Sequence, residues 1–160
     1  LIGDTSMATT VAQRLVELGI ELPSPSAPVA NYVPARLSGN LLVVSGQLPM
    51  ESGAVRYKGK LGGTVSLEDG VAAARLCAIN ILAQVKLACG DLERIAACLR
   101  LGGFVACTPD FVDHPKIVNG ASDLMVAVLG EAGRHARAAV GVPSLPLDAA
   151  VEVEAMFELR

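Results

Sequence analysis

The segment from Val151 to Leu159 alternates strictly between apolar and more polar side chains, and this pattern constrains the fold more than any other feature. The odd-numbered positions carry Val, Val, Ala, Phe and Leu, whereas the even-numbered positions carry Glu, Glu, Met and Glu. A period of two residues is typical of a β-strand with one face buried in a hydrophobic core. Glu152 is therefore expected on the less apolar face of a strand.

A turn just before this strand is indicated by Pro143 and Pro146. A hairpin folded around residues 142–147 would place Arg137 and Glu152 opposite each other across one antiparallel pair. Two interpretations of this pair stay open. Geometry alone favours a plain cross-strand ion pair. The alternative is a site that holds a small carboxylate and handles water.

The rest of the chain predicts helices and further strands. Helices are predicted over residues 7–18, 66–89 and 115–131 from apolar residues at helical spacing, and strands over residues 32–36, 40–48 and 95–108. Ser66 and Gly90 are the expected caps of the long helix, and Pro115 fits the first turn of the next one. Gly102 and Gly103 suggest a bulge within their strand.

The order of these elements predicts an α+β fold in which two helices pack on one face of a mixed sheet. We expect one domain over residues 31–160, preceded by a helix and a Pro/Ser-rich connector over residues 1–30. The glycine-rich segment 51–63 is expected to be a mobile loop. A neighbouring subunit is the natural cover for the second face of the sheet.

Composition and charge narrow the possible partners. Charged residues make up only 18% of the chain, below the ~25% that is usual for soluble domains, which favours self-association over an unusually large core. The net charge of −3 and the scattered Lys and Arg argue against a nucleic-acid partner. No apolar run approaches the ~20 residues of a membrane span. The N-terminus lacks an export signal, so we expect a cytoplasmic protein with no membrane contact.

The cysteines and histidines show no metal-binding pattern. The chain has four cysteines, Cys77, Cys89, Cys98 and Cys107. Each lies in an apolar stretch at a spacing that matches no CxxC motif, which predicts core packing in a reducing compartment. His114 and His135 have no ligand spacing either, and we predict neither a metal nor a cofactor. A nucleophilic cysteine would need a nearby histidine or helix N-terminus, and nothing in the sequence points to one.

Three further polar positions are candidates for ligand contacts. Ser45 and Gly46 follow a buried strand, where a hydroxyl and an accessible backbone N–H could meet a ligand. A turn that ends the strand is the simpler interpretation of this segment. Asn119, inside a predicted helix, is either a ligand donor or a solvated amide.

Taken in order, several motifs resemble those of one known family. Tyr32 is followed by Ser-Gly-Gln at residues 45–47. Arg137 is followed by Leu-Pro at 145–146 and by Val-Glu-Val-Glu-Ala at 151–155. This series resembles the Rid family, also called YjgF or L-PSP proteins, the reactive-intermediate deaminases.

The resemblance implies a chorismate-mutase-like fold, assembled as a barrel-like homotrimer with clefts between subunits. It also implies that Arg137 grips a substrate carboxylate and that Glu152 orients water. The positions that would line the pocket are Tyr32, Ser45, Gly46, Asn119 and Ala139. Ala139 stands where the best-known branch usually has Cys, and His135 stands where the family usually has Pro.

The activity implied by the resemblance is hydrolytic deamination of reactive enamines and imines such as 2-aminoacrylate, giving 2-keto acids and ammonia without a cofactor. Two alternatives stay open. One is a non-catalytic protein that binds small carboxylic acids in the same cleft. The other is an endoribonuclease of the L-PSP type, which the acidic charge disfavours. The longer N-terminal segment and glycine-rich loop indicate a divergent branch.

Overall fold

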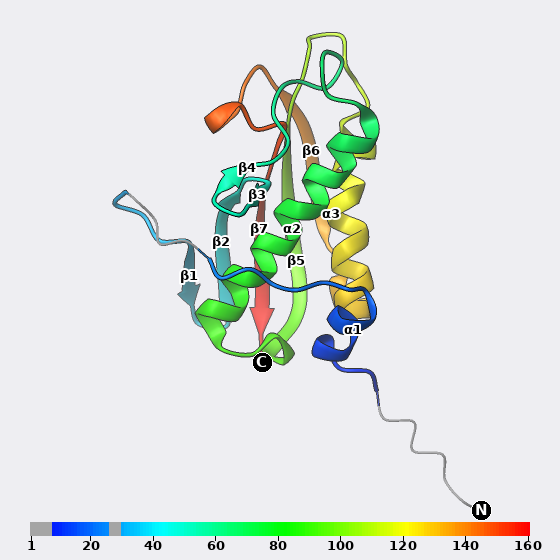
Figure 1. Cartoon of the computed structure of the whole chain (residues 1–160). Helices are drawn as coiled ribbons and strands as arrows, with labels where there is room; N and C mark the ends of the chain where they lie inside the picture. The colour runs from blue at the N-terminus through cyan, green and yellow to red at the C-terminus, as the bar shows by residue number, and fades with distance from the viewer. Residues whose placement is uncertain (1–7, 26–29) are drawn as a thin grey trace, which may run out of the picture.

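The computed structural model describes residues 8–25 and 30–160 and shows helices laid against a β-sheet (Figure 1). The helices are α1 (Val11–Glu17), α2 (Leu67–Cys89) and α3 (His114–Leu129). The strands are β1 (Ala35–Ser38), β2 (Leu41–Gln47), β3 (Met50–Glu51), β4 (Ala54–Val55), β5 (Ile95–Ala106), β6 (Ala136–Val142) and β7 (Val151–Leu159). The predicted helix start at Met7 and positions 26–29 of the predicted connector lie outside the described residues.

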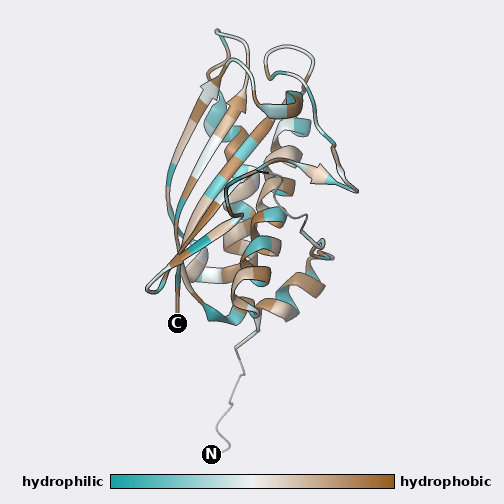
Figure 2. Ribbon diagram, turned by 90° about the vertical axis from the view of Figure 1, so that its left-hand side faces the viewer, coloured by the Kyte–Doolittle hydropathy of each residue, from teal (hydrophilic) through white to brown (hydrophobic). Residues whose placement is uncertain are grey.

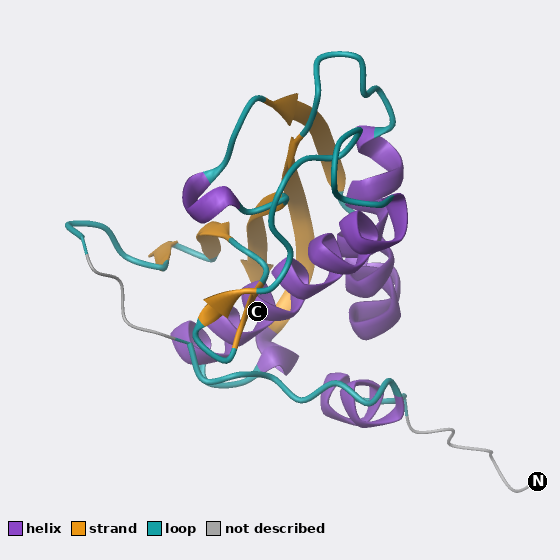
Figure 3. Cartoon of the chain, turned by 45° about the horizontal axis from the view of Figure 1, so that its top comes forward, coloured by secondary structure: helices purple, strands orange, loops and turns teal. Residues whose placement is uncertain are grey.

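Five strands form the main sheet in the order β1-β2-β7-β5-β6, while β3 and β4 form a separate small hairpin. β6 runs parallel to β5 and the other neighbours pair antiparallel, so the sheet is mixed. α2 and α3 lie side by side on one face of this sheet (Figure 3). The predicted α+β fold with two helices on one face of a mixed sheet is confirmed.

The predicted hairpin between the last two strands is wrong. β6 lies at the edge of the sheet beside β5, whereas β7 is inserted between β2 and β5. Parallel strands need a long crossover connection, and α3 supplies it between β5 and β6. The turn before β7 then carries the chain back across the sheet, with Leu147 and Asp148 at positive φ. β5 therefore separates Arg137 from Glu152.

The ends of the two long helices follow from local side-chain chemistry. The Ser66 hydroxyl accepts a hydrogen bond from the Asp69 N–H at 3.1 Å, which satisfies one free donor in the first turn of α2. Gly90 ends α2 with φ at +84°, a conformation that favours glycine. Pro115 lies in the first turn of α3, where no N–H donor is needed. All three predicted helix-end residues are confirmed.

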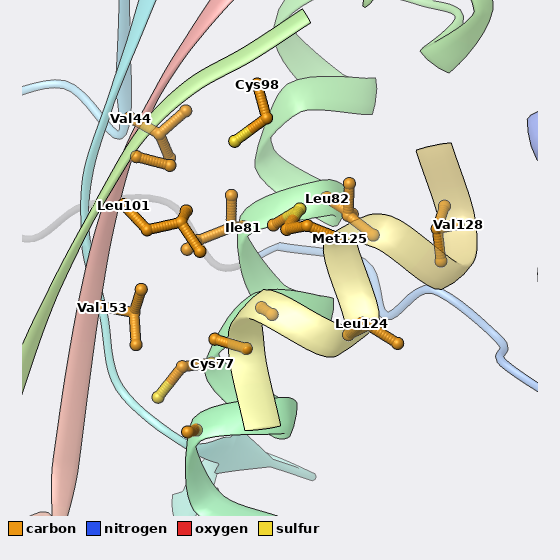
Figure 4. Close-up of a cluster of buried hydrophobic side chains, with 14 of the residues drawn as sticks. Val44, Cys77, Ile81, Leu82, Cys98, Leu101, Leu124, Met125, Val128 and Val153 are labelled. Atoms are coloured by element: carbon orange, nitrogen blue, oxygen red, sulfur yellow. The ribbon is translucent and has the colours of Figure 1, made fainter. Parts of the chain in front are cut away.

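The core lies between the sheet and the two long helices, and it is built from aliphatic side chains. Figure 4 shows side chains of β2, β5 and β7 facing those of α2 and α3. The odd-numbered positions of β7 all point into this core, and Phe157 is fully buried. Cys77 and Cys98 are buried as predicted, while Cys89 and Cys107 are only half-buried at its rim.

The bulges of β5 differ from the predicted one. They lie near the start of the strand, between Ile95 and Ala97 and again before Arg100. Gly102 and Gly103 instead permit close packing on both faces of the strand. A Cβ at residue 102 would lie 2.7 Å from the Glu154 carboxylate, and one at residue 103 would lie 2.5 Å from the Val118 side chain.

The glycine-rich segment 51–63 is anchored to the domain, contrary to the expectation of a mobile loop. It contributes to the β3–β4 hairpin. Lys58 then pairs with Ala149, and Leu61 pairs with Cys107. Leu61 is fully buried, and its burial fixes this segment beneath the end of α2.

α2 also corrects the expectation that no apolar run is long enough to reach across a membrane. At 23 residues, it has the length and hydropathy of a membrane-spanning helix. More than half of its most apolar window, 56%, is buried within the protein. This burial is typical of the central core helix of a folded domain.

Gly120 marks the closest approach of α3 to α2. A Cβ at this position would overlap the backbone carbonyl oxygen of Val71. Gly120→Ala is expected to lower the free energy of unfolding by about 1–3 kcal/mol, because the two helices must move apart. Urea denaturation measures this loss. Asp123→Ala, at an exposed position of the same helix, should change stability by less than about 0.5 kcal/mol. Equal stability of the two variants would contradict a tight contact at Gly120.

Candidate functional site

Arg137 lies at the start of β6, the edge strand of the sheet. Its side chain is exposed and reaches over α3, where Nη1 donates to Asn119 Oδ1 at 2.8 Å and to Ser122 Oγ at 3.1 Å. Asn119 and Ser122 are one helical turn apart and thus share a face of α3. The two bonds hold the guanidinium in place and leave its Nε and Nη2 donors without a partner among the described residues.

Ser122, which binds Arg137, is itself hydrogen-bonded to His135. His135 Nδ1 lies 2.6 Å from the Gly133 carbonyl oxygen, and Nε2 lies 2.9 Å from Ser122 Oγ. A carbonyl oxygen only accepts, so Nδ1 carries the proton, and in the neutral imidazole Nε2 accepts from the Ser122 hydroxyl. The same hydroxyl oxygen accepts from Arg137. Ser122 and His135 were not predicted as site residues. The one signal in the sequence was His135 in place of the family's usual proline.

Glu152 lies on β7 and points to the sheet face that the helices do not cover. Burial raises the pKa of its carboxyl group, and the nearby charge of Glu154 raises it further. A Cβ at Gly46 of β2 would overlap Glu152 Oε1, so the absence of a side chain at residue 46 leaves room for the carboxylate. A carboxylate with a raised pKa accepts a proton more readily than an exposed one.

The raised pKa of Glu152 predicts a pH-dependent effect on stability. Because folding raises this pKa, the charged carboxylate destabilises the native state once the pH exceeds the ordinary value of 4.5. Glu152→Gln should therefore raise the Tm at neutral pH, and the gain should shrink as the pH falls toward 4.5. Thermal melts between about pH 4 and pH 8 measure both Tm values. A gain that is independent of pH would come from packing and not from charge.

The structure does not bring Arg137 and Glu152 of one chain together. Arg137 contacts α3 on the helix-covered face, whereas Glu152 lies on the opposite face, and β5 runs between their strands. Within residues 8–25 and 30–160, the ion pairs are Arg56–Glu51, Arg100–Glu154, Lys116–Asp113 and Arg134–Glu131. The interpretation of Arg137 and Glu152 as a cross-strand ion pair is therefore wrong.

The predicted site residues, together with Ser122 and His135, instead form two groups. The Arg137 group consists of Arg137, Asn119, Ser122 and His135, and the Glu152 group consists of Glu152, Gly46, Ser45 and Tyr32. Ser45 Oγ donates to the Val33 carbonyl oxygen at 2.7 Å, which ties the segment that carries Tyr32 to β2. Ala139 lies two residues after Arg137, faces the same side of β6 and packs against the hydrophobic core.

A groove of about 920 Å³ runs between residues 19–25, β2 and α2. Tyr32 and Gly46 of the Glu152 group line it, together with Asn80 and Gln84 of α2. No member of the Arg137 group reaches this groove. Glu152 itself is not among the residues that line the groove.

The fold defines a class of protein. A mixed sheet with two helices on one face is the fold of the chorismate-mutase-like proteins described by one family model. That model, "YjgF/chorismate mutase-like, putative endoribonuclease", matches residues 12–159. The chain belongs to this YjgF family, as its motifs predicted.

Several known proteins are similar to the chain over nearly its whole length. Protein TCP17 of Trypanosoma cruzi is 47% identical over 151 residues, which cover 94% of each chain. The crystal structure of Atu1372 from Agrobacterium tumefaciens, described as of unknown function, is 54% identical, with a TM-score of 0.88 over 94% of this chain and 92% of that one. The crystal structure of "a putative endoribonuclease" from Shewanella oneidensis MR-1 is 41% identical, with a TM-score of 0.91 over 94% and 99% of the two chains.

Proposed function

We propose that the protein hydrolyses small enamines and imines that carry a carboxylate, such as 2-aminoacrylate, to 2-keto acids and ammonia. The observation that carries this proposal is the exposed Arg137 guanidinium, held by Asn119 and Ser122 with its remaining donors free for a ligand. A guanidinium binds a carboxylate through two parallel charge-assisted hydrogen bonds, which are stronger than neutral ones. Membership of the YjgF family supports the same assignment.

The reaction requires only proton transfers and water. The enamine becomes an imine when a proton moves from nitrogen to the terminal carbon. Water then adds to the C=N carbon while its proton passes to Glu152, and Glu152 returns that proton to nitrogen. The hydroxyl proton of this adduct then passes to the same nitrogen while the C–N bond breaks and the C=O bond forms, and ammonia leaves. The raised pKa of Glu152 suits a group that both accepts and returns a proton.

We place the complete site between two copies of the chain in a homotrimer. Arg137 and Glu152 of one chain lie on opposite faces of the sheet, so a small acid that contacts both must take one residue from each of two chains. Figure 2 shows the sheet at one side of the molecule and the helices at the other. Apolar side chains are exposed on the uncovered face of the sheet and are available for such an assembly. Leu41, Val43 and Val140 are 38%, 43% and 45% exposed on it. Exposed apolar patches of this kind favour protein contacts.

The decisive experiment is a deamination assay. The pure protein is mixed with freshly generated 2-aminoacrylate, and 2-keto acid and ammonia release are followed against the rate without protein. Acceleration is the expected result. If the rate is unchanged while the protein binds 2-ketobutyrate in calorimetry, the chain is a binding protein and not a deaminase.

Binding of small carboxylic acids without turnover is the second candidate function. It is favoured by the completeness of the Arg137 group within one chain, since that group needs no residue from another copy to hold a carboxylate. Only the placement of Glu152 against the bound acid separates the two functions. The assay above therefore distinguishes them directly.

RNA cleavage is the third candidate function, and the charge of the chain disfavours it. The description of the family and that of the Shewanella protein name an endoribonuclease. Binding of a phosphate backbone relies on clustered Lys and Arg. This chain has a net charge of −3, and several of its described basic side chains are paired with carboxylates, namely Arg56, Arg100, Lys116 and Arg134.

We also propose that the protein works in the cytoplasm. All four of its cysteines are free thiols. A reducing compartment keeps thiols in this state.

A further inference from the structure

The end of β5 and the first turn of α3 bring a thiol and an imidazole together. Cys107 follows the last residue of β5, and His114 is the first residue of α3. Cys107 Sγ lies 3.4 Å from His114 Nε2. Both side chains are half-buried, so the pair lies at the surface of the core. This contact depends on the fold, so no base for Cys107 could be predicted from the sequence.

Neighbouring groups fix the positions of the Cys107 and His114 side chains. The Cys107 N–H donates to the Val142 carbonyl oxygen of β6 at 3.0 Å, which fixes the backbone that carries the thiol. The Phe111 ring packs edge-on against the imidazole, with ring centres 5.5 Å apart and planes at 80°. Gly141 of β6 lies against both groups. A Cβ there would overlap His114 Nε2 and lie 2.7 Å from Cys107 Sγ.

Among the described residues, no imidazole lies against any of the other three cysteines. Burial raises the pKa of the Cys98 thiol to about 12 and that of Cys77 well above its ordinary value, so both stay protonated. Cys89 is half-buried like Cys107, but its thiol donates to the Asp91 carbonyl oxygen at 3.3 Å, which cannot take a proton. Cys89 is therefore a matched reference for Cys107 within the same molecule.

The pair is separate from the Arg137 group and is not a metal site. Gly141 lies four residues after Arg137 on β6, about 13 Å along a strand, so the pair lies toward the other end of β6. In the part of the chain that the structure describes, no third His, Cys, Asp or Glu joins Cys107 and His114 as a metal ligand would. A metal would need at least three protein ligands here.

We propose that Cys107 and His114 form a second reactive centre, at which the Cys107 thiol adds to small α,β-unsaturated carbonyl compounds. In the tautomer protonated on Nδ1, His114 Nε2 takes the thiol proton. The sulfur then bonds to the β-carbon, and the C=C electron pair moves toward the carbonyl. The imidazolium returns its proton to the α-carbon, so the product is a thioether and nothing is oxidised or reduced. Nucleophilic cysteines in proteins are activated by such a neighbouring base.

The test uses N-ethylmaleimide, an α,β-unsaturated imide, on the full native chain. Modification is followed by intact mass, and peptide mapping assigns it to each cysteine. Cys107 is expected to react at least roughly tenfold faster than Cys89, whereas Cys77 and Cys98 stay unmodified. A Cys107 rate no higher than that of Cys89 would overturn the proposal without reference to any variant.

Two variants test the role of the pair by different routes. His114→Gln removes the proton acceptor, and Gly141→Ala pushes the imidazole and the thiol apart while leaving both in the chain. Each should slow Cys107 at least roughly tenfold and leave the Cys89 rate unchanged. Protection of Cys77 and Cys98 reports that each variant is folded. If Cys107 keeps its rate in both folded variants, the imidazole plays no part in the reaction.

Discussion

Replacing Arg137 with alanine is expected to lower kcat/KM for 2-aminoacrylate by at least roughly thirtyfold. A carboxylate bound in a desolvated cleft loses about 2–5 kcal/mol when its cationic partner is removed, because its charge is left unpaired. At about 1.4 kcal/mol per factor of ten, the lower end of this range already gives the thirtyfold loss. The measurement is the initial rate of 2-keto acid release at several substrate concentrations.

Two controls separate binding from folding. Arg134→Ala removes an exposed arginine three residues away, whose partner is Glu131, and should leave kcat/KM unchanged. Arg137→Lys keeps the charge but loses the two-pronged geometry, so its kcat/KM should lie between those of the parent and Arg137→Ala. If Arg137→Ala deaminates as fast as the parent protein while folded, the proposed mechanism is wrong.

The parts of the fold that local sequence determines could be predicted. β7 was evident because its alternation depends only on which face of one strand is buried. The ends of α2 were evident because Ser66 and Gly90 act on the backbone within a few residues. Each of these features is decided over a short stretch of chain.

The order of the strands in the sheet could not be predicted from the local sequence. Two strands separated by a short Pro-rich turn look like a hairpin, yet β7 pairs with β5 and β2 and not with β6. This choice depends on α3, which carries the chain over the sheet and sets β6 parallel to β5. Pairing between distant segments is a property of the whole fold, so proximity in sequence was misleading here.

The candidate site, too, could be predicted only in part from the sequence. The motifs identified Arg137 and Glu152, but they gave no indication that the two residues lie on opposite faces of the sheet. Ser122 and His135 were missed because the bonds of Ser122 to Arg137 and to His135 exist only once α3 packs beside β6. The raised pKa of Glu152 likewise arises from burial in the folded sheet.

Because Glu152 is the proposed proton acceptor, Glu152→Gln tests the second half of the site beside Arg137→Ala. Glutamine keeps the shape of the side chain and much of its hydrogen bonding, but it cannot accept the proton of water. kcat is expected to fall by roughly a hundredfold or more, with little change in the affinity for a 2-keto acid. The two variants should thus each be nearly inactive for different reasons.

Trimers that contain both variant chains are expected to regain activity. A site between two copies can combine Arg137 from a Glu152→Gln chain with Glu152 from an Arg137→Ala chain. In any trimer that contains both chains, one of the three sites combines a native Arg137 with a native Glu152, so roughly one third of the sites should turn over like the parent. The two chains are co-expressed with different tags and purified through both, and light scattering checks that the product has the mass of three chains. If each site were built within one chain, every site would lack either Arg137 or Glu152, and the mixed trimers would stay as inactive as the separate variants.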